Sequence, residues 1–195
     1  MNIRVIYLKM IQSLAVFCGS KNGNAAIYTE HAAQLGQLLA KHNITLIYGG
    51  GGKGIMKTIA DHVMENGGTV IGVIPKILID WEHQHKNISK LIITDDMHSR
   101  KKTLYKLCDA ALVLPGGLGT LDELFEMLTW NQLSIHDKKI FIMNPGGFFD
   151  HLIRHIASLE ENGFLYEPAG KRIKYFNDPS EFEIYLTEQD QNPKL

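Results

Sequence analysis

One stretch of the chain reads Leu112-Val113-Leu114-Pro115-Gly116-Gly117-Leu118-Gly119-Thr120-Leu121-Asp122-Glu123. An apolar run ends at Pro115, three closely spaced glycines follow, and a helical pattern begins at Thr120. This order predicts a strand, a tight glycine loop and the start of a helix. Such a junction exposes unpaired backbone N–H groups at the positive end of the helix dipole, and glycine lets a ligand approach the backbone closely. The stretch therefore predicts an anion-binding site.

Two carboxylates, Asp122 and Glu123, follow the predicted loop and would repel a bound anion. One interpretation is structural: Thr120 and Glu123 have the spacing of a capping box, in which each side chain satisfies a backbone N–H group. The other interpretation is chemical. A sugar 5′-phosphate that loses its base becomes cationic at the anomeric carbon, and a nearby carboxylate can stabilise that cation or activate water.

The same residues, Pro115 to Glu123, resemble the PGGxGTxxE signature of the LOG ("lonely guy") family. This family consists of cytokinin riboside 5′-monophosphate phosphoribohydrolases, formerly described as possible lysine decarboxylases. Residues 96–101 are similar to its DMHxRK motif and residues 129–136 to its TWxQLGIH motif. With Val16-Phe17-Cys18-Gly19-Ser20 and Tyr48-Gly49-Gly50-Gly51, the resemblance extends over roughly residues 13–149.

The resemblance implies specific roles for individual residues. Arg100 and Glu123 match the catalytic pair of the family, and Lys101, Thr129 and Glu82 match substrate-contacting positions. The guanidinium of Arg100 is a planar donor suited to phosphate or carboxylate. The other predicted substrate-binding residues belong to the glycine-rich loops: Gly19, Ser20, Gly50, Gly51, Gly116, Gly117, Leu118, Gly119 and Thr120.

Each of these assignments has a structural alternative. A basic triplet such as residues 100–102 is usually a solvated helix face. A threonine inside a helix, as predicted for Thr129, can bond back to the chain. The residues around Glu82 differ from those of plant members, and only its distance from Arg100 supports the match. The segment Ser20-Lys21-Asn22-Gly23, Lys57 and Leu118 also depart from the usual family sequence, which bears on substrate preference.

A second glycine run, Gly49-Gly50-Gly51-Gly52-Lys53-Gly54, has the G-x-G-x-x-G spacing of dinucleotide-binding folds. The next predicted strand ends in Val73-Ile74-Pro75 and offers no acidic residue for a ribose hydroxyl, which argues against NAD. The run also lacks the Ser or Thr of a Walker loop. It predicts either a close backbone approach to a mononucleotide or only a tight turn between a strand and a helix.

The composition limits the class of protein. The chain has 195 residues, 45% of them hydrophobic and 21% charged, as in a soluble globular protein. A net charge of −1 gives no field that would attract nucleic acid or a membrane surface. Two cysteines in apolar surroundings, Cys18 and Cys108, are typical of a reduced cytoplasmic protein. The cluster Glu82, His83 and His85 is a poor metal site without a further ligand, so no metal is expected. No cofactor is expected either.

Strand-like and helix-like segments alternate along the chain, which predicts a doubly wound, mostly parallel, Rossmann-like α/β fold. Residues 11–195 are predicted to form one domain, preceded by a 1–10 extension or by a translation start at Met10 instead of Met1. The expected strands are 14–18, 44–48, 69–74, 91–94, 110–114 and 139–143, with one possible further strand at 172–176. The expected helices are 24–41, 55–65, 97–107, 121–133, 148–161 and a short one after Pro179.

The functional hypothesis is hydrolysis of the N-glycosidic bond of a nucleoside 5′-monophosphate, either AMP or a cytokinin riboside monophosphate. Two alternatives stay open at this point: a non-catalytic carrier of a nucleotide or of the molybdenum cofactor, and a broad nucleotide nucleosidase used in salvage. The only expected partners are the nucleotide substrate and, from the family resemblance, a second copy of the chain. That homodimer would pack the helices around Met97 and Leu121 across its two-fold axis.

Overall fold

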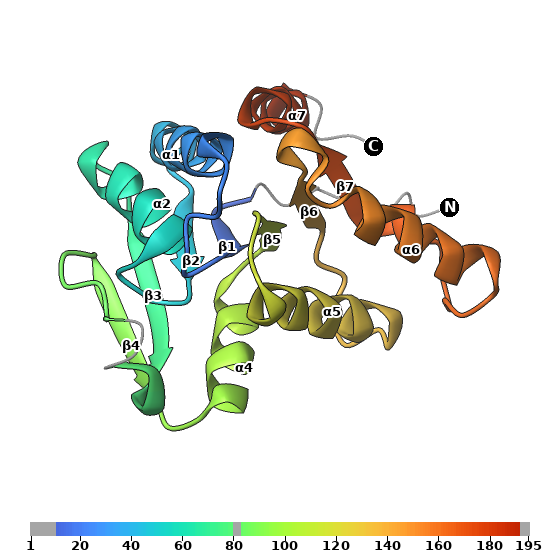
Figure 1. Cartoon of the computed structure of the whole chain (residues 1–195), viewed down its shortest axis with the longest axis horizontal. Coiled ribbons are helices and arrows are strands. Elements are labelled where there is room, and N and C mark those ends of the chain that lie inside the picture. Colours follow the sequence, from blue (N-terminus) through green and yellow to red (C-terminus); the bar gives the residue numbers. More distant parts are fainter. Residues whose placement is uncertain (1–10, 80–82, 192–195) are drawn as a thin grey trace, which may run out of the picture.

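The computed structural model describes residues 11–79 and 83–191. Its strands form a single seven-stranded sheet in the order β4-β3-β2-β1-β5-β6-β7, and every neighbouring pair is parallel (Figure 1). The strands are β1 (Ser13–Phe17), β2 (Thr45–Tyr48), β3 (Val70–Pro75), β4 (Lys90–Thr94), β5 (Ala110–Val113), β6 (Ile140–Met143) and β7 (Ile173–Phe176). The predicted fold class is confirmed.

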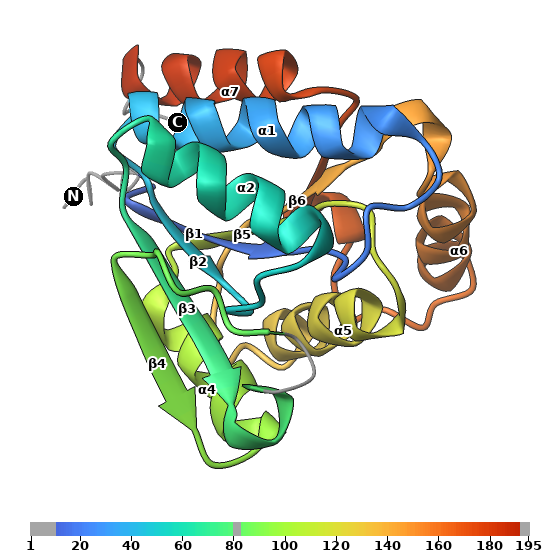
Figure 2. The ribbon, with the colours of Figure 1, turned by 60° about the vertical axis from the view of Figure 1, so that its left-hand side comes forward.

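Helices cover both faces of the sheet, because most of the crossovers between its parallel strands carry one. The helices are α1 (Ala26–Lys41), α2 (Gly54–Glu65), α4 (Met97–Leu107), α5 (Leu118–Gln132), α6 (Asp150–Glu161) and α7 (Pro179–Gln191). In Figure 2, α1, α2 and α7 lie above the sheet, whereas α4 and α5 lie below it. Short 3-10 turns occupy Lys76–Leu78, Pro145–Gly147 and Ala169–Lys171.

The central strands are apolar on both sides because both of their faces are buried. Alternate residues of β1 enter two separate cores: Leu14 and Val16 pack toward α1 and α2, whereas Ala15 and Phe17 pack toward α4 and α5. All four are at most 2% exposed. At about 25 cal/mol for each Å² of apolar surface buried, these two cores supply the main stabilisation of the sheet.

The order of the strands determines where a ligand can bind. From β1 the chain winds outward through β2, β3 and β4, and it then crosses back to place β5 on the other side of β1. The connections that leave β1 and β5 run in opposite directions, toward β2 and toward β6, and open a crevice beyond the carboxyl ends of these two strands. The loops at these two ends begin at Cys18 and at Leu114. The predicted site residues Gly19 and Ser20 and those of the loop before Thr120 therefore border the crevice.

The start of α5 differs from the prediction. The helix begins at Leu118 instead of residue 121, and its N-cap is Gly117, whose position carries no side-chain cap. Thr120 is therefore already in the first helical turn, and the structural interpretation of Thr120 and Glu123 as a capping box is wrong. The last helix is also longer than expected, since α7 has 13 residues. The N-terminal extension predicted over residues 1–10 lies outside the described residues.

Within the described ranges, no helix has the length and apolar character needed to cross a membrane.

Candidate active site

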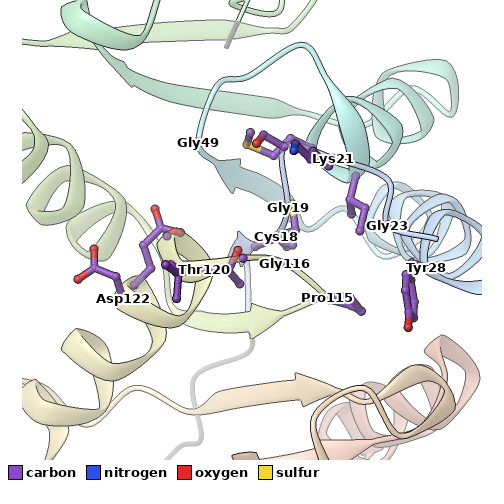
Figure 3. Close-up of a pocket in the computed structure, with 18 of the residues that line it drawn as sticks. Cys18, Gly19, Lys21, Gly23, Tyr28, Gly49, Pro115, Gly116, Thr120 and Asp122 are labelled. Carbon is purple, nitrogen blue, oxygen red and sulfur yellow. The ribbon is translucent and has the colours of Figure 1, made fainter. Parts of the chain in front are cut away.

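A cavity of about 470 Å³ lies at the crevice between β1 and β5 (Figure 3). Its walls come from the loop after β1, the turn after β2, the start of α4 and the loop that leads into α5. Of the predicted site residues it contains Gly19, Ser20, Arg100, Gly116, Gly117, Leu118, Gly119, Thr120 and Glu123.

The loops after β1 and β5 are joined directly. The N–H group of Gly19 donates to the carbonyl of Pro115 at 3.0 Å. Gly116 lies over Thr120 so closely that a Cβ atom at Gly116 would come within 2.1 Å of Thr120 Oγ1. Glycine at position 116 is therefore required by packing, and Thr120, only 4% exposed, is held against the floor of the cavity.

Gly117 and Gly119 differ from Gly116 in this respect. A Cβ atom at either position would meet nothing within 4 Å, and neither residue has a positive φ angle. Neither the backbone conformation nor the packing of this chain requires glycine there. Both residues border the cavity at the N-terminus of α5, where N–H groups lack partners within the helix. The open space is where a bound group can approach those N–H groups.

Arg100 reaches the cavity from the first turn of α4. That helix begins at a proper N-cap, because Oδ1 of Asp96 accepts a hydrogen bond from the Ser99 N–H group at 2.8 Å, which lowers the pKa of Asp96. The Arg100 guanidinium donates through Nε to the Val73 carbonyl at 3.1 Å and through Nη2 to the Gly49 carbonyl at 3.3 Å. A Cβ atom at Gly49 would lie 2.3 Å from Nη2. The turn after β2 thus makes room for this side chain.

Arg100 and Glu123 face each other in the cavity. Nη1 of Arg100 lies 4.0 Å from Oε1 of Glu123, and the residues are 6% and 9% exposed, respectively. Because both charges are largely removed from water, their interaction is stronger than that of a surface pair. The carboxylate of Glu123 therefore lies in the cavity, near the Arg100 guanidinium and beside the glycine loop.

Lys101 is positioned differently. Its ammonium group pairs with Asp122 at 2.9 Å and with Glu126 at 3.4 Å, both on α5, and it is absent from the cavity lining. These acidic partners raise the pKa of Lys101, although partial burial opposes them. The Tyr105 hydroxyl, also on α4, lies 2.8 Å from Glu126 Oε2 and 3.2 Å from the Glu123 carbonyl. These polar contacts join the helix that carries Arg100 to the helix that carries Glu123.

The other predicted residues do not line this cavity. Gly50 accepts a hydrogen bond from the His85 N–H group at 3.0 Å, and Gly51 pairs with Gln84, so both turn toward the segment before β4. Thr129 bonds back to the Phe125 carbonyl at 2.7 Å and borders a separate apolar pocket of about 260 Å³. Glu82 lies outside the described residues.

The cavity also contains residues that the sequence analysis did not assign to the site. Lys21, Asn22 and Tyr28 come from the loop after β1 and from α1, and Phe148 follows β6. Tyr28 and Phe148 contact each other edge to face, with ring centroids 5.4 Å apart. Their common signal was position: each follows the carboxyl end of a strand next to the switch point, where ligands of such sheets bind.

Across residues 11–79 and 83–191, no group of three His, Cys, Asp or Glu side chains is placed to hold a metal ion. His85, a member of the weak metal pattern, instead pairs with Asp61 at 2.8 Å. Asp61 also pairs with Lys57, and both contacts lower its pKa against the effect of burial.

These features define a class: a doubly wound parallel α/β protein with an anion-binding loop at its switch point and a buried acid–arginine pair beside that loop. Residues 56–186 match the family described as "Possible lysine decarboxylase". The chain is 39% identical over 183 residues to an Arabidopsis thaliana protein named probable cytokinin riboside 5′-monophosphate phosphoribohydrolase LOG6, covering 94% of this chain and 90% of the relative. It is 40% identical to Arabidopsis thaliana LOG1, covering 93% and 84% of the two chains. The chain belongs to this LOG family, as its motifs predicted.

Solved structures share the fold at lower sequence identity. The molybdenum cofactor binding protein from Rippkaea orientalis superimposes with a TM-score of 0.68 at 20% identity, covering 95% of this chain and 99% of that one. The molybdenum cofactor carrier protein of Chlamydomonas reinhardtii gives a TM-score of 0.70 at 19% identity, covering 92% and 98%. At this identity the likeness shows the fold alone.

Proposed function

We propose that this protein hydrolyses the N-glycosidic bond of a nucleoside 5′-monophosphate, releasing a free base and ribose 5-phosphate. The observation that carries the proposal is the 4.0 Å approach of Arg100 to Glu123 in a cavity shared with the glycine loop. A phosphate needs the N–H groups of the loop, whereas a carboxylate beside it is useful only if part of the ligand becomes positive. A nucleotide that loses its base satisfies both conditions.

The phosphate binds at the start of α5 in this proposal. Gly117 and Gly119 leave the backbone open, and Thr120 contributes its hydroxyl from the floor of the cavity. The helix dipole favours the anion here, and the N–H groups of the first turn direct it. Each charge-assisted hydrogen bond of this kind contributes about 1.5–3 kcal/mol.

Glu123 acts on the ribose. As the bond between the anomeric carbon and the base nitrogen lengthens, the sugar becomes oxocarbenium-like, and the carboxylate stabilises that charge or accepts a proton from the attacking water. The water oxygen forms the new bond to the anomeric carbon, and the departing base gains a proton. Arg100, held by two backbone carbonyls, orients Glu123 and assists departure of the base.

Three residues that the family resemblance assigns to substrate binding are not among the described residues that line the cavity. Lys101, engaged with Asp122 and Glu126, fits a positioning role for α5 in a single chain. Thr129 faces outward and could meet a nucleotide only across an assembly of two chains. For Glu82, substrate binding is proposed from the family resemblance alone.

The test is to incubate the protein with AMP and with N6-isopentenyl-AMP and to measure free base by chromatography. We expect release from at least one nucleotide and a loss of more than about a hundredfold in Glu123→Gln and in Arg100→Ala, the size of effect typical of general acid–base groups. Glu188→Gln on the exposed face of α7 is the matched control. Normal rates in either site variant would reject the assignment.

The same assay separates the two alternatives. A carrier of a nucleotide or of the molybdenum cofactor would bind a phosphate ligand without turnover, and Glu123→Gln would bind it equally well. A broad salvage nucleosidase would release bases from a panel of purine and pyrimidine monophosphates at similar values of kcat/KM. The names of the curated relatives favour the adenine-type, cytokinin nucleotide.

Assembly and location belong to the same proposal. Apolar side chains stay exposed on α5 and after it, with Phe125 at 38%, Leu133 at 57% and Ile135 at 60%. Packing this surface against a second copy would cover it, which supports the homodimer implied by the family. A single-chain mass by light scattering would contradict it. Cys18 and Cys108 are buried thiols, as is typical of a reducing cytoplasmic compartment.

A further inference from the structure

We propose that Lys21 supplies the cation that binds the 5′-phosphate and thereby fixes which way the nucleotide lies in the cavity. The inference rests on the proposed function and adds a specificity-determining residue to it. Lys21 lies in the segment Ser20-Lys21-Asn22-Gly23, where this chain departs from the usual family sequence.

A bound phosphate brings more negative charge than the start of α5 can balance. A phosphate monoester carries about −1.5 to −2 charges at neutral pH, whereas the N-terminus of a helix offers the equivalent of about half a positive charge. The loop from Pro115 to Thr120 contains no basic residue. Most of the charge of the phosphate must therefore be balanced by side chains from other elements.

The cationic side chains near the cavity differ in whether the protein already balances their charge. Arg100 already donates to two carbonyls and faces Glu123, and Lys101 pairs with Asp122 and Glu126 away from the cavity. Lys21 lines the cavity, and within the described ranges no carboxylate lies at ion-pair distance from it. It is thus the cavity cation whose charge is not balanced by the protein itself.

Packing fixes the backbone of Lys21. The carbonyl of Gly19 accepts a hydrogen bond from the Met56 N–H group at 3.2 Å. Gly54, with a φ of 59°, lies under the loop so closely that a Cβ atom on it would come within 2.4 Å of the backbone nitrogen of Lys21. At the other end, Gly23 packs on the ring of Tyr28. The loop therefore holds Lys21 at one wall of the cavity.

Lys21 and the carboxylates of α5 lie on opposite sides of the glycine loop. In Figure 3 Asp122 lies on one side of Thr120 and Gly116, and the loop with Gly19 and Lys21 lies on the other. The positive charges on the side of α5 are already engaged, since Lys101 pairs with Asp122 and Arg100 faces Glu123. A phosphate on the intervening N–H groups is therefore attracted toward Lys21. The ribose is then directed to Glu123, which is the orientation that hydrolysis requires.

The test compares Lys21→Met with Lys53→Met, which removes the same charge from an exposed residue at the start of α2 outside the cavity lining. Two quantities are measured: the KM for AMP, and the inhibition constant of the product ribose 5-phosphate. We expect both to rise about tenfold or more in Lys21→Met, near the lower end of one charge-assisted hydrogen bond. We expect kcat to change less than KM, Lys21→Arg to retain most of the affinity, and Lys53→Met to behave as the wild type.

Unchanged constants in Lys21→Met, or equal losses in both Met variants, would overturn the inference while leaving the proposed hydrolysis intact. If the wild-type protein releases no base at all, the proposed function fails. Binding of ribose 5-phosphate, followed by calorimetry, then decides the role of Lys21 separately. A tenfold weaker affinity in Lys21→Met supports the phosphate contact, and equal affinities refute it.

Discussion

Replacing Gly119 by alanine should make the protein more stable and less active. Gly119 is exposed in the first turn of α5, two residues after the Gly117 N-cap, and an added Cβ atom would meet nothing within 4 Å. Its φ is not positive, so alanine can adopt the same conformation. The folded chain alone would therefore gain from the substitution, because glycine in a helix costs conformational entropy.

The two opposing effects can be estimated. Alanine in place of glycine stabilises a helix by about 0.5–1 kcal/mol, with the smaller value suited to the first turn. For a chain of 195 residues this raises Tm by about 1–4 °C. In the proposed complex, however, the methyl group occupies space through which a phosphate oxygen approaches the N–H groups. Loss of one charge-assisted hydrogen bond, about 1.5–3 kcal/mol, lowers kcat/KM by about ten- to a hundredfold.

Thermal unfolding and steady-state hydrolysis of AMP measure these two effects on the same preparation. Gly170→Ala is the matched control, since a Cβ atom at Gly170 also meets nothing within 4 Å and the residue lies outside the cavity. We expect Gly170→Ala to keep its full kcat/KM. A Gly119→Ala protein with unchanged kcat/KM would refute the idea that a ligand, and not the fold, requires glycine at this position. A destabilised one would refute the structural estimate.

Two further predictions concern side chains outside the cavity. Tyr105→Phe removes a buried hydroxyl that contacts Glu126 and the Glu123 carbonyl, so it should destabilise the fold by about 1 kcal/mol in urea unfolding and lower kcat more than it raises KM; an unchanged kcat would show that Tyr105 does not position Glu123. Burial, aided by the charge of Lys138, lowers the pKa of His136, whose Nδ1 lies 2.7 Å from Asn131 Oδ1. Because the native state resists this protonation, stability should decline as the pH falls below about 6.5, and His136→Asn should decline less over the same range.

The sequence predicted the fold well because the central strands of a buried parallel sheet are continuous apolar runs, and β1, β2, β3 and β5 are closed by a glycine or proline at or just after their ends. It failed at the start of α5, where Leu118-Gly119 looks like loop sequence. The helix there begins after Gly117, which has no side-chain cap, and Thr120 and Glu123 both line the cavity. A pattern of letters cannot separate these cases, because a threonine and a glutamate at that spacing fit either geometry.

The site was predictable where it depended on strand ends and less so where it depended on side-chain direction. Gly19, Ser20 and the loop before α5 line one cavity, as expected for loops at adjacent strand ends. Lys101 neighbours Arg100 in sequence, yet the helical turn directs it to Asp122 and Glu126. Thr129 is three helical turns along α5 from the loop, and its hydroxyl bonds back to the Phe125 carbonyl, a direction that the family motif does not encode.

The glycines around the cavity fall into two groups, and the distinction separates folding from ligand binding. At Gly49 and Gly116 a Cβ atom would strike Arg100 or Thr120, so glycine there lets the site's own side chains reach their places. At Gly117 and Gly119 nothing in the chain would be struck. A protein selected for stability alone would gain by filling the second kind of position. Gly170 is equally open but lies outside the cavity, so openness alone does not identify a binding site. At Gly117 and Gly119 the open space is part of a cavity that Glu123 and Lys21 also line, and we infer that the phosphate of the proposed substrate binds there.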